Sequence, residues 1–324
     1  MQAQDLLAAS LGIWVRGGAV TIREVSRARE QDRSIVRLWC LRGTLHIVPS
    51  ADARWLLDLL RPRFSAANRA RRGQLGLDDA LTTRGMRILV DSLEREGPLT
   101  RPQIAQRLAA QQIPWQGQAT IHIIWRAALD GLVCYGPQRG DEETFVLLDE
   151  WLPPSATLDR DDALAALARH FLQAYGPATA LDLARWSGLS TADARRSLWL
   201  LGAEAREIST VLGPMRVVGE QAHAEPPVGV RLLPAFDGLW LGYRERDVLL
   251  PSAYRRQIYP GGGVIRPTVL LDGRPVGTWA RRAIGDRTSV AFDWFDTAAR
   301  REPEAFQAVL DDLGRFLGRP AVAR

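Results

Sequence analysis

Two glutamines, Gln2 and Gln4, lie two residues apart at the start of the chain. A glutamine side chain has no titratable group, so it cannot act as a general base in the usual sense. Its amide does offer an acceptor oxygen and two donor hydrogens. Two such amides can hold and polarise one water molecule. That suffices for hydrolysis only when the leaving group needs no help to depart.

The spacing of the two glutamines fits this chemistry only if the local backbone is extended. Residues two apart point the same way in an extended segment but diverge on a helix. If Asp5 is the N-cap of a following helix, Gln2 and Gln4 precede that helix and can converge on one spot. The alternative is a frayed terminus that carries two solvated amides.

A second motif, Arg42-Gly43-Thr44-Leu45-His46, follows. On an alternating strand the side chain of His46 shares a face with Thr44, from which it can approach a phosphate or a substrate. A structural hydrogen bond from His46 to nearby backbone is the alternative. Arg42, at the expected turn of a hairpin, is placed to reach a phosphate or to enter a minor groove. The alternative for Arg42 is a plain surface role.

Charge is distributed unevenly along the chain. All 42 basic residues are arginines, so no lysine is available to form a Schiff base. Residues 1–75 hold 13 arginines against six acids, while the remaining residues carry a net charge of −2. A basic first quarter favours contact with a polyanion, and a solvated basic face without a partner is the alternative. The densest basic run either forms a solvated linker or follows a phosphate backbone, and it consists of Arg61, Arg63, Arg69, Arg71 and Arg72.

Composition excludes several classes of protein. No run of 18 apolar residues is present, so no membrane span is expected, and the start lacks the pattern of a secretion signal. Cys40 and Cys134 are far apart and read as small buried hydrophobes in a reducing compartment. We therefore expect a cytoplasmic, nucleoid-associated protein. The histidines have no ligand partners at metal-binding spacing, so neither a metal nor another cofactor is expected.

The pattern of helices and strands predicts an α+β protein with repeated modules. Helices over residues 81–96, 101–110 and 118–130, with Thr100 and Gln103 as a capping box, precede strands at 132–135 and 145–148. Three helices followed by a two-stranded ribbon are typical of a winged helix. The pattern recurs in helices at 161–175, 179–187 and 190–202 with a hairpin near 212–215.

The two ends of the chain complete this organisation. The N-terminal segment resembles the same module without its first helices. It has a helix at 5–15, strands at 35–41 and 44–48, and a closing helix at 51–60. Strands at 229–233, 264–271 and 275–279, with Asp272-Gly273 as a hairpin turn, precede a closing helix at 303–317. We predict three tandem winged helices at 1–72, 73–154 and 155–222, and a β-rich domain at 223–324, with linkers near Arg72-Gly73, 153–154 and 222–227.

Four motifs together resemble the bacterial DNA glycosylases of the AlkZ type over nearly the whole chain. They are Gln2-Ala3-Gln4, Arg42-Gly43-Thr44-Leu45-His46, Leu232-Leu233-Pro234-Ala235-Phe236-Asp237 and Gly273-Arg274-Pro275-Val276-Gly277-Thr278-Trp279. The resemblance implies that Gln2 and Gln4 are catalytic and that Asp237 is a fixed, mostly structural acid. It also implies a monomer that cradles duplex DNA and hydrolyses cationic N-alkylpurines, including interstrand crosslinks. The family usually carries a few helical turns before the glutamine motif, where this sequence has only Met1, so we expect an incomplete first module.

The predicted chemistry agrees with that substrate class. A base alkylated at N7 or N3 already carries positive charge, which weakens its bond to deoxyribose, so an enzyme needs only to orient water. The expected DNA-binding residues are Arg37, Arg42, Thr44, His46, Arg61, Arg63, Arg69, Arg71 and Arg72. The alternative function is a winged-helix DNA-binding protein or regulator without catalysis.

Overall fold

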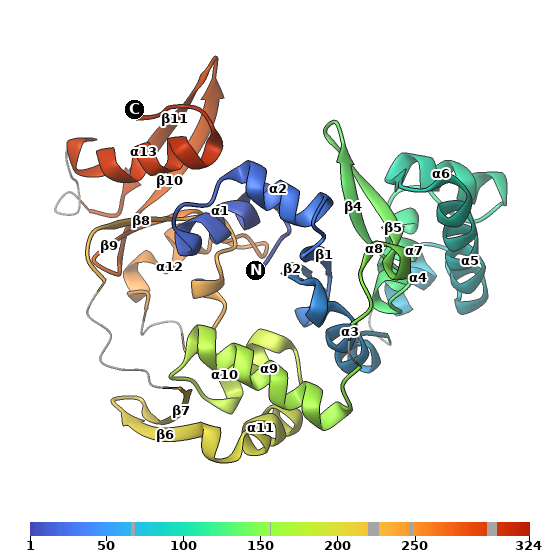
Figure 1. Ribbon diagram of the computed structural model, residues 1–324, viewed down its shortest axis with the longest axis horizontal. Coiled ribbons are helices and arrows are strands. Elements are labelled where there is room, and N and C mark those ends of the chain that lie inside the picture. The colour runs from blue at the N-terminus through green and yellow to red at the C-terminus, as the bar shows by residue number, and fades with distance from the viewer. Residues whose placement is uncertain (66–68, 156, 220–226, 246–248, 297–302) are drawn as a thin grey trace. The chain divides into compact units, whose positions relative to one another are not determined.

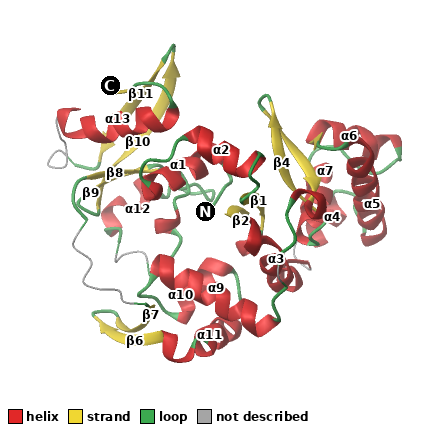
Figure 2. Ribbon diagram, viewed as in Figure 1, coloured by secondary structure: helices red, strands yellow, loops and turns green. Residues whose placement is uncertain are grey.

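The computed structural model describes residues 1–65, 69–155, 157–219, 227–245, 249–296 and 303–324. It shows helices with several small sheets (Figure 2), as expected of an α+β protein. The chain divides into two compact units. The first comprises Met1–Ser26, Phe171–Trp186 and Ala203–Arg324, and the second comprises Arg27–His170 and Ser187–Gly202.

The second unit contains the predicted order of three helices and a ribbon (Figure 1). Its elements are α5 (Asp79–Glu96), β3 (Leu99–Thr100), α6 (Arg101–Ala110), α7 (Ala119–Leu129), β4 (Val133–Arg139) and β5 (Glu142–Leu147). The strands form a sheet in the order β3-β5-β4, in which β5 pairs antiparallel to both neighbours. A short helix, α8 (Leu148–Trp151), follows.

Local sequence signals set these boundaries. Gly97, with a φ of 73°, ends α5 in a conformation that favours glycine. Thr100 and Gln103 form the predicted capping box, because each side chain hydrogen-bonds the other residue's backbone N–H. Leu89, Ile104 and Ile123 are buried together in the core of this module. Burial of these apolar side chains is the main force that holds the three helices together.

The first part of this unit is a hairpin followed by helices. Strands β1 (Ile35–Trp39) and β2 (Leu45–Pro49) pair antiparallel around a short 3-10 turn, η1 (Leu41–Gly43), as predicted. Helix α3 (Ser50–Ser65) is longer than expected, and α4 (Arg69–Gln74) follows. Arg72 and Gly73, where a linker was predicted, lie in α4. Helix α2 (Ile22–Glu30) was not predicted, because few of its residues are apolar.

The second repeat of the helical pattern is also present. Its elements are α9 (Arg160–Tyr175), α10 (Ala180–Ser187), α11 (Thr191–Leu200), β6 (Ala205–Thr210) and β7 (Gly213–Val218). Thr179 and Ser190 cap the second and third of these helices through side-chain bonds to the backbone of Asp182 and Asp193. The boundary between the compact units divides these elements, since α10 and the β6–β7 hairpin belong to the first unit and α11 to the second.

The C-terminal part of the first unit is a five-stranded sheet in the order β12-β11-β10-β9-β8. Its elements are β8 (Val230–Leu233), β9 (Thr268–Leu271), β10 (Arg274–Ile284), β11 (Arg287–Trp294) and β12 (Ala321–Ala323), with helices α12 (Arg255–Ile258) and α13 (Gln307–Leu317). Asp272-Gly273 makes the predicted turn, with both residues at positive φ. Strands β11 and β12 were not predicted.

Helix α1 (Leu6–Gly17) belongs to the same compact unit as this sheet. It packs against β8, and its Trp14 ring lies 5.8 Å from the ring of Phe316 in α13. The sequence suggests one module at 1–72, but the start of that segment packs with the C-terminal sheet. Nonlocal packing thus ties the glutamine motif to the far end of the chain.

Candidate functional site

The glutamine motif lies immediately before α1. Gln2 is half-buried, Ala3 is fully buried and Gln4 is exposed. The next residue, Asp5, has extended backbone and accepts a hydrogen bond from the Ala8 amide at 2.7 Å. The predicted N-cap is therefore confirmed, and both glutamines precede the helix. The alternative considered from the sequence, a frayed terminus, does not agree with the burial of Ala3.

The segment before α1 also packs back on the helix. Gly12 is buried in α1, and a Cβ built there would lie 2.7 Å from the Sδ atom of Met1. The absence of a side chain at Gly12 thus leaves room for Met1. This contact and the Asp5 cap fix the backbone on either side of Gln2 and Gln4.

Helix α1 is itself anchored by polar side-chain contacts. Arg16 donates two hydrogen bonds to Asp237, at 2.9 and 2.7 Å. Burial alone lowers the pKa of Arg16, but the hydrogen bond and charge of Asp237 outweigh burial and raise it. The indole Nε1 of Trp14 donates to Asp312 at 3.0 Å. Asp237, predicted to be mostly structural, is 1% exposed and fills that role by holding α1 to the segment after β8.

The Arg42–His46 motif forms the turn and second strand of the β1–β2 hairpin. Arg42 and Gly43 both have positive φ, and the hydroxyl of Thr44 donates to the Leu41 carbonyl at 3.1 Å. His46 is 3% exposed, with its Nδ1 3.0 Å from the Thr44 carbonyl. Burial, with the charge of Arg42, lowers the pKa of His46 well below its usual value. His46 is therefore neutral near pH 7, and the structural hydrogen bond considered from sequence is present.

Gly188 supports this turn. It was not among the functional residues predicted from the sequence. It has a φ of 84°, and a Cβ there would lie 3.1 Å from the Cα of Arg42. Its carbonyl accepts a hydrogen bond from Arg63. The only sequence signal was a glycine just before the helix cap at Ser190, which is also typical of an ordinary loop.

The remaining arginines predicted to bind DNA fall into two groups. Arg37 and Arg72 are buried, at 3% and 2% exposed. Arg37 pairs with Glu143 and lies 4.4 Å over the Tyr135 ring, and Arg72 lies 3.3 Å from Asp79. The exposed members occupy α3 and α4 instead of a linker, and they are Arg61, Arg63, Arg69 and Arg71.

In the part of the chain that the structure describes, no group of three or more His, Cys, Asp or Glu side chains is arranged to hold a metal ion. Cys40 and Cys134 are free and buried, and burial raises the pKa of Cys40 to about 11. No single described helix is long and apolar enough to cross a membrane, although α1 and α2 pass that test when counted together as a bent pair.

Comparison with known proteins identifies the class to which this fold and motif belong. Residues 1–316 match the family described as DNA glycosylase AlkZ-like. The chain therefore belongs to the AlkZ-like DNA glycosylases, and its resemblance in sequence to that family is confirmed.

Two comparisons place the chain more closely within the family. It is 30% identical over 304 residues to the interstrand DNA cross-link repair glycosylase of Streptomyces sahachiroi, covering 86% of this chain and 79% of the relative. Its structure is similar to that of the Streptomyces sahachiroi DNA glycosylase AlkZ, with a TM-score of 0.78 and 25% identity, over 100% of this chain and 91% of that one.

Proposed function

We propose that this DNA glycosylase is monofunctional and hydrolyses the N-glycosidic bond of cationic N-alkylated purines in duplex DNA, with Gln2 and Gln4 positioning the water. The observation that carries the proposal is the placement of the two glutamines around buried Ala3, before a helix capped by Asp5. Positioning of this kind lowers a barrier only if the groups are held in place before the reaction. The anchored helix α1 supplies that support.

The proposed reaction needs little from the enzyme beyond orientation. The C1′–N9 bond of an N7-alkylguanine breaks, and its electron pair neutralises the departing cationic purine. A water oxygen forms the new bond to C1′, and the water proton passes to solvent. The products are a neutral alkylated base, an abasic site and one proton. The glutamine amides accept hydrogen bonds from the water and donate hydrogen bonds to it, but they do not take the proton that the water loses.

The absence of lysine supports the monofunctional assignment. A glycosylase that also cleaves the backbone commonly forms a Schiff base between an amine and C1′, and no lysine is present in the sequence. The abasic product should therefore stay intact until alkali is added.

The modules of helices and ribbons would serve as the DNA cradle. We propose three tandem winged helices, with Arg42, Thr44 and the exposed arginines of α3 and α4 along the path of the backbone. The relative named as an interstrand cross-link repair glycosylase supports the inclusion of crosslinked purines among the substrates. We propose that the enzyme acts as a monomer.

The experiment uses a duplex with a single N7-methylguanine. The wild-type enzyme should release 7-methylguanine, detected by mass spectrometry, and leave a strand that breaks only after alkali. Borohydride should trap no covalent enzyme–DNA adduct. Salt-dependent binding without base release would instead support a DNA-binding protein or regulator. A trapped adduct would contradict the monofunctional mechanism.

A further inference from the structure

The helix-turn-helix of the second unit has an unusual charge pattern. It comprises α6, the turn at residues 111–118, and α7. No aspartate or glutamate occurs between Arg101 and Leu129. Two of its arginines are neutralised by carboxylates outside that stretch, since Arg107 pairs with Glu96 and Arg126 with Asp130.

Three exposed arginines hydrogen-bond to the turn and its ends at residues 111–118, and none of the three is paired with a carboxylate in the described part of the chain. Arg71 donates to the side-chain oxygen of Gln118 at 2.8 Å. Arg84 donates to the Gln111 carbonyl at 3.2 Å, and Arg101 to the Gly117 carbonyl at 2.7 Å.

All these acceptors are neutral, and no ion pair links any of these three arginines to a carboxylate within the described part of the chain. A guanidinium has five N–H donors, so each retains both its charge and unused donors. The pKa of nearby His122 is lowered, first by burial and then by the charges of Arg71 and Arg72, as expected beside a positive patch.

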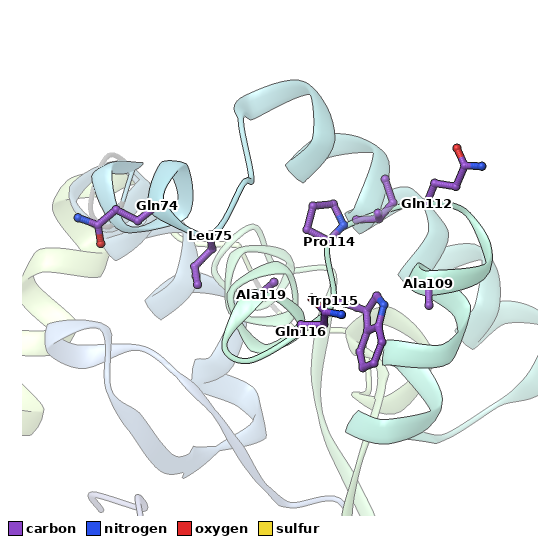
Figure 3. A pocket seen from close by; sticks show the side chains of 9 residues that line it. Gln74, Leu75, Ala109, Gln112, Pro114, Trp115, Gln116 and Ala119 are labelled. Carbon is purple, nitrogen blue, oxygen red and sulfur yellow. The ribbon is translucent and has the colours of Figure 1, made fainter.

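Helix α7 is the second helix of this helix-turn-helix, the position of a recognition helix. It does not present a free face for reading bases. Eight of the 11 residues of α7 are buried, and the helix carries mainly apolar side chains. The turn before it is accessible instead, with Gln112, Trp115 and Gln116 exposed and Trp115 at 43%. These residues border a recess of about 520 Å³ (Figure 3). The module therefore offers hydrogen-bond donors and positive charge at its turn.

We propose that the turn at 111–118, with Arg71, Arg84 and Arg101, binds the sugar–phosphate backbone of duplex DNA. The partner follows from the family, whose substrate is DNA, and from the charge of the patch. Guanidinium and amide donors commonly bind phosphate oxygens, and such contacts position a protein without reading sequence. Because α7 is buried, the contact holds DNA in register and does not select bases. The proposal does not depend on the role of Gln2 and Gln4.

The test compares two triple variants that change net charge equally. The first is Arg71→Gln, Arg84→Gln, Arg101→Gln. The control is Arg27→Gln, Arg107→Gln, Arg196→Gln, which removes arginines paired with Asp32, Glu96 and Asp161. Affinity for an undamaged duplex is measured by fluorescence anisotropy over a range of salt concentrations. Thermal unfolding confirms that each variant is folded.

We expect the first variant to bind about tenfold more weakly, or worse, and its salt slope to fall by about 0.9 for each lost phosphate contact. The control should change both quantities far less. Equal losses in the two variants, or an unchanged slope in the first, would overturn the proposal.

Hydrogen exchange supplies a second readout that needs no variant. Amides of residues 111–118 in the wild type should exchange more slowly when saturating duplex is bound, and unchanged exchange would contradict the contact. A failure of the glutamine mechanism would abolish release without changing these binding results, so the two proposals fail separately.

Discussion

Arg16 and Asp237 are 221 residues apart in the sequence and form a two-pronged ion pair, with N–O distances of 2.9 and 2.7 Å. The Asp237 side chain is fully buried and also accepts a hydrogen bond from the Leu239 amide at 2.8 Å. Because Arg16 lies on the helix that follows Gln2 and Gln4, the pair fixes the proposed water-positioning segment to the C-terminal part of the fold.

Removal of Arg16 should therefore affect both stability and chemistry. Arg16→Met leaves a buried carboxylate without its cation, and we expect the free energy of unfolding to fall by about 3 kcal/mol. Urea denaturation measures this loss, and base release should slow as α1 shifts. Arg27→Met is the control, since Arg27 and Asp32 form an exposed pair at 3.3 Å that should contribute less than about 1 kcal/mol. Equal losses in the two variants would refute an anchoring role.

Gly188 should be required beside Arg42. Gly188→Ala places a Cβ 3.1 Å from the Cα of Arg42 on a backbone of positive φ. We expect a loss of about 2 kcal/mol in unfolding free energy, and weaker binding of duplex DNA as the turn moves. Gly131→Ala is the matched control, with a φ of 76° and no neighbour within 4 Å. It should lose stability from the backbone alone and keep its DNA affinity. If Gly188→Ala binds duplex DNA as tightly as the wild type, the turn at Arg42 does not contribute to DNA binding.

His46 should make stability fall at acidic pH. Its pKa in the folded protein lies well below the ordinary value, chiefly because it is buried. The unfolded chain therefore takes up a proton as pH falls below about 6.5, while the folded protein does not. Unfolding free energy should decrease there by up to about 1.4 kcal/mol per pH unit from this group.

The His46→Gln variant removes that proton uptake, so its stability should depend less steeply on pH between 6.5 and 5. Urea denaturation across this pH range compares this variant with the wild type. Identical slopes for His46→Gln and the wild type would show that His46 is not the group responsible.

Arg37 offers a test between structural and DNA-binding roles. Its guanidinium is buried, pairs with Glu143 and lies over Tyr135. We expect Arg37→Met to lower the unfolding free energy by about 2 kcal/mol, because a charged hydrogen bond is lost while Glu143, 38% exposed, can be solvated. The salt slope of DNA binding should stay unchanged in protein that remains folded. If the salt slope of the variant instead fell by about 1, the loss of one phosphate contact, Arg37 would bind DNA as predicted from the sequence.

Local signals in the sequence predicted much of the helical part. Thr100 with Gln103, and Gly97 before them, mark helix ends through contacts within a few residues, so spacing alone is informative. The packing of α1 with the C-terminal sheet was not predictable in this way, because Arg16 and Asp237 meet only in the folded chain.

Strand β12 shows the same limit. It is three residues long and pairs parallel to β11. Three residues are too few to show a strand pattern in the sequence, so the strand is recognised only by its pairing with β11. At the site, the sequence identified the glutamines and the Arg42–His46 motif. The pairing of buried Arg37 with Glu143 and the support from Gly188 depend on neighbours distant in sequence.

The most direct test of the central claim is the single-turnover rate of 7-methylguanine release by the Gln2→Ala, Gln4→Ala double variant at saturating enzyme. Gln307→Ala, an exposed glutamine on α13, is the control. We predict that the double variant releases the base at least about 100-fold more slowly than the wild type, with unchanged affinity for undamaged duplex. The control should react at the wild-type rate. A double variant that retains the wild-type rate would contradict water positioning by Gln2 and Gln4.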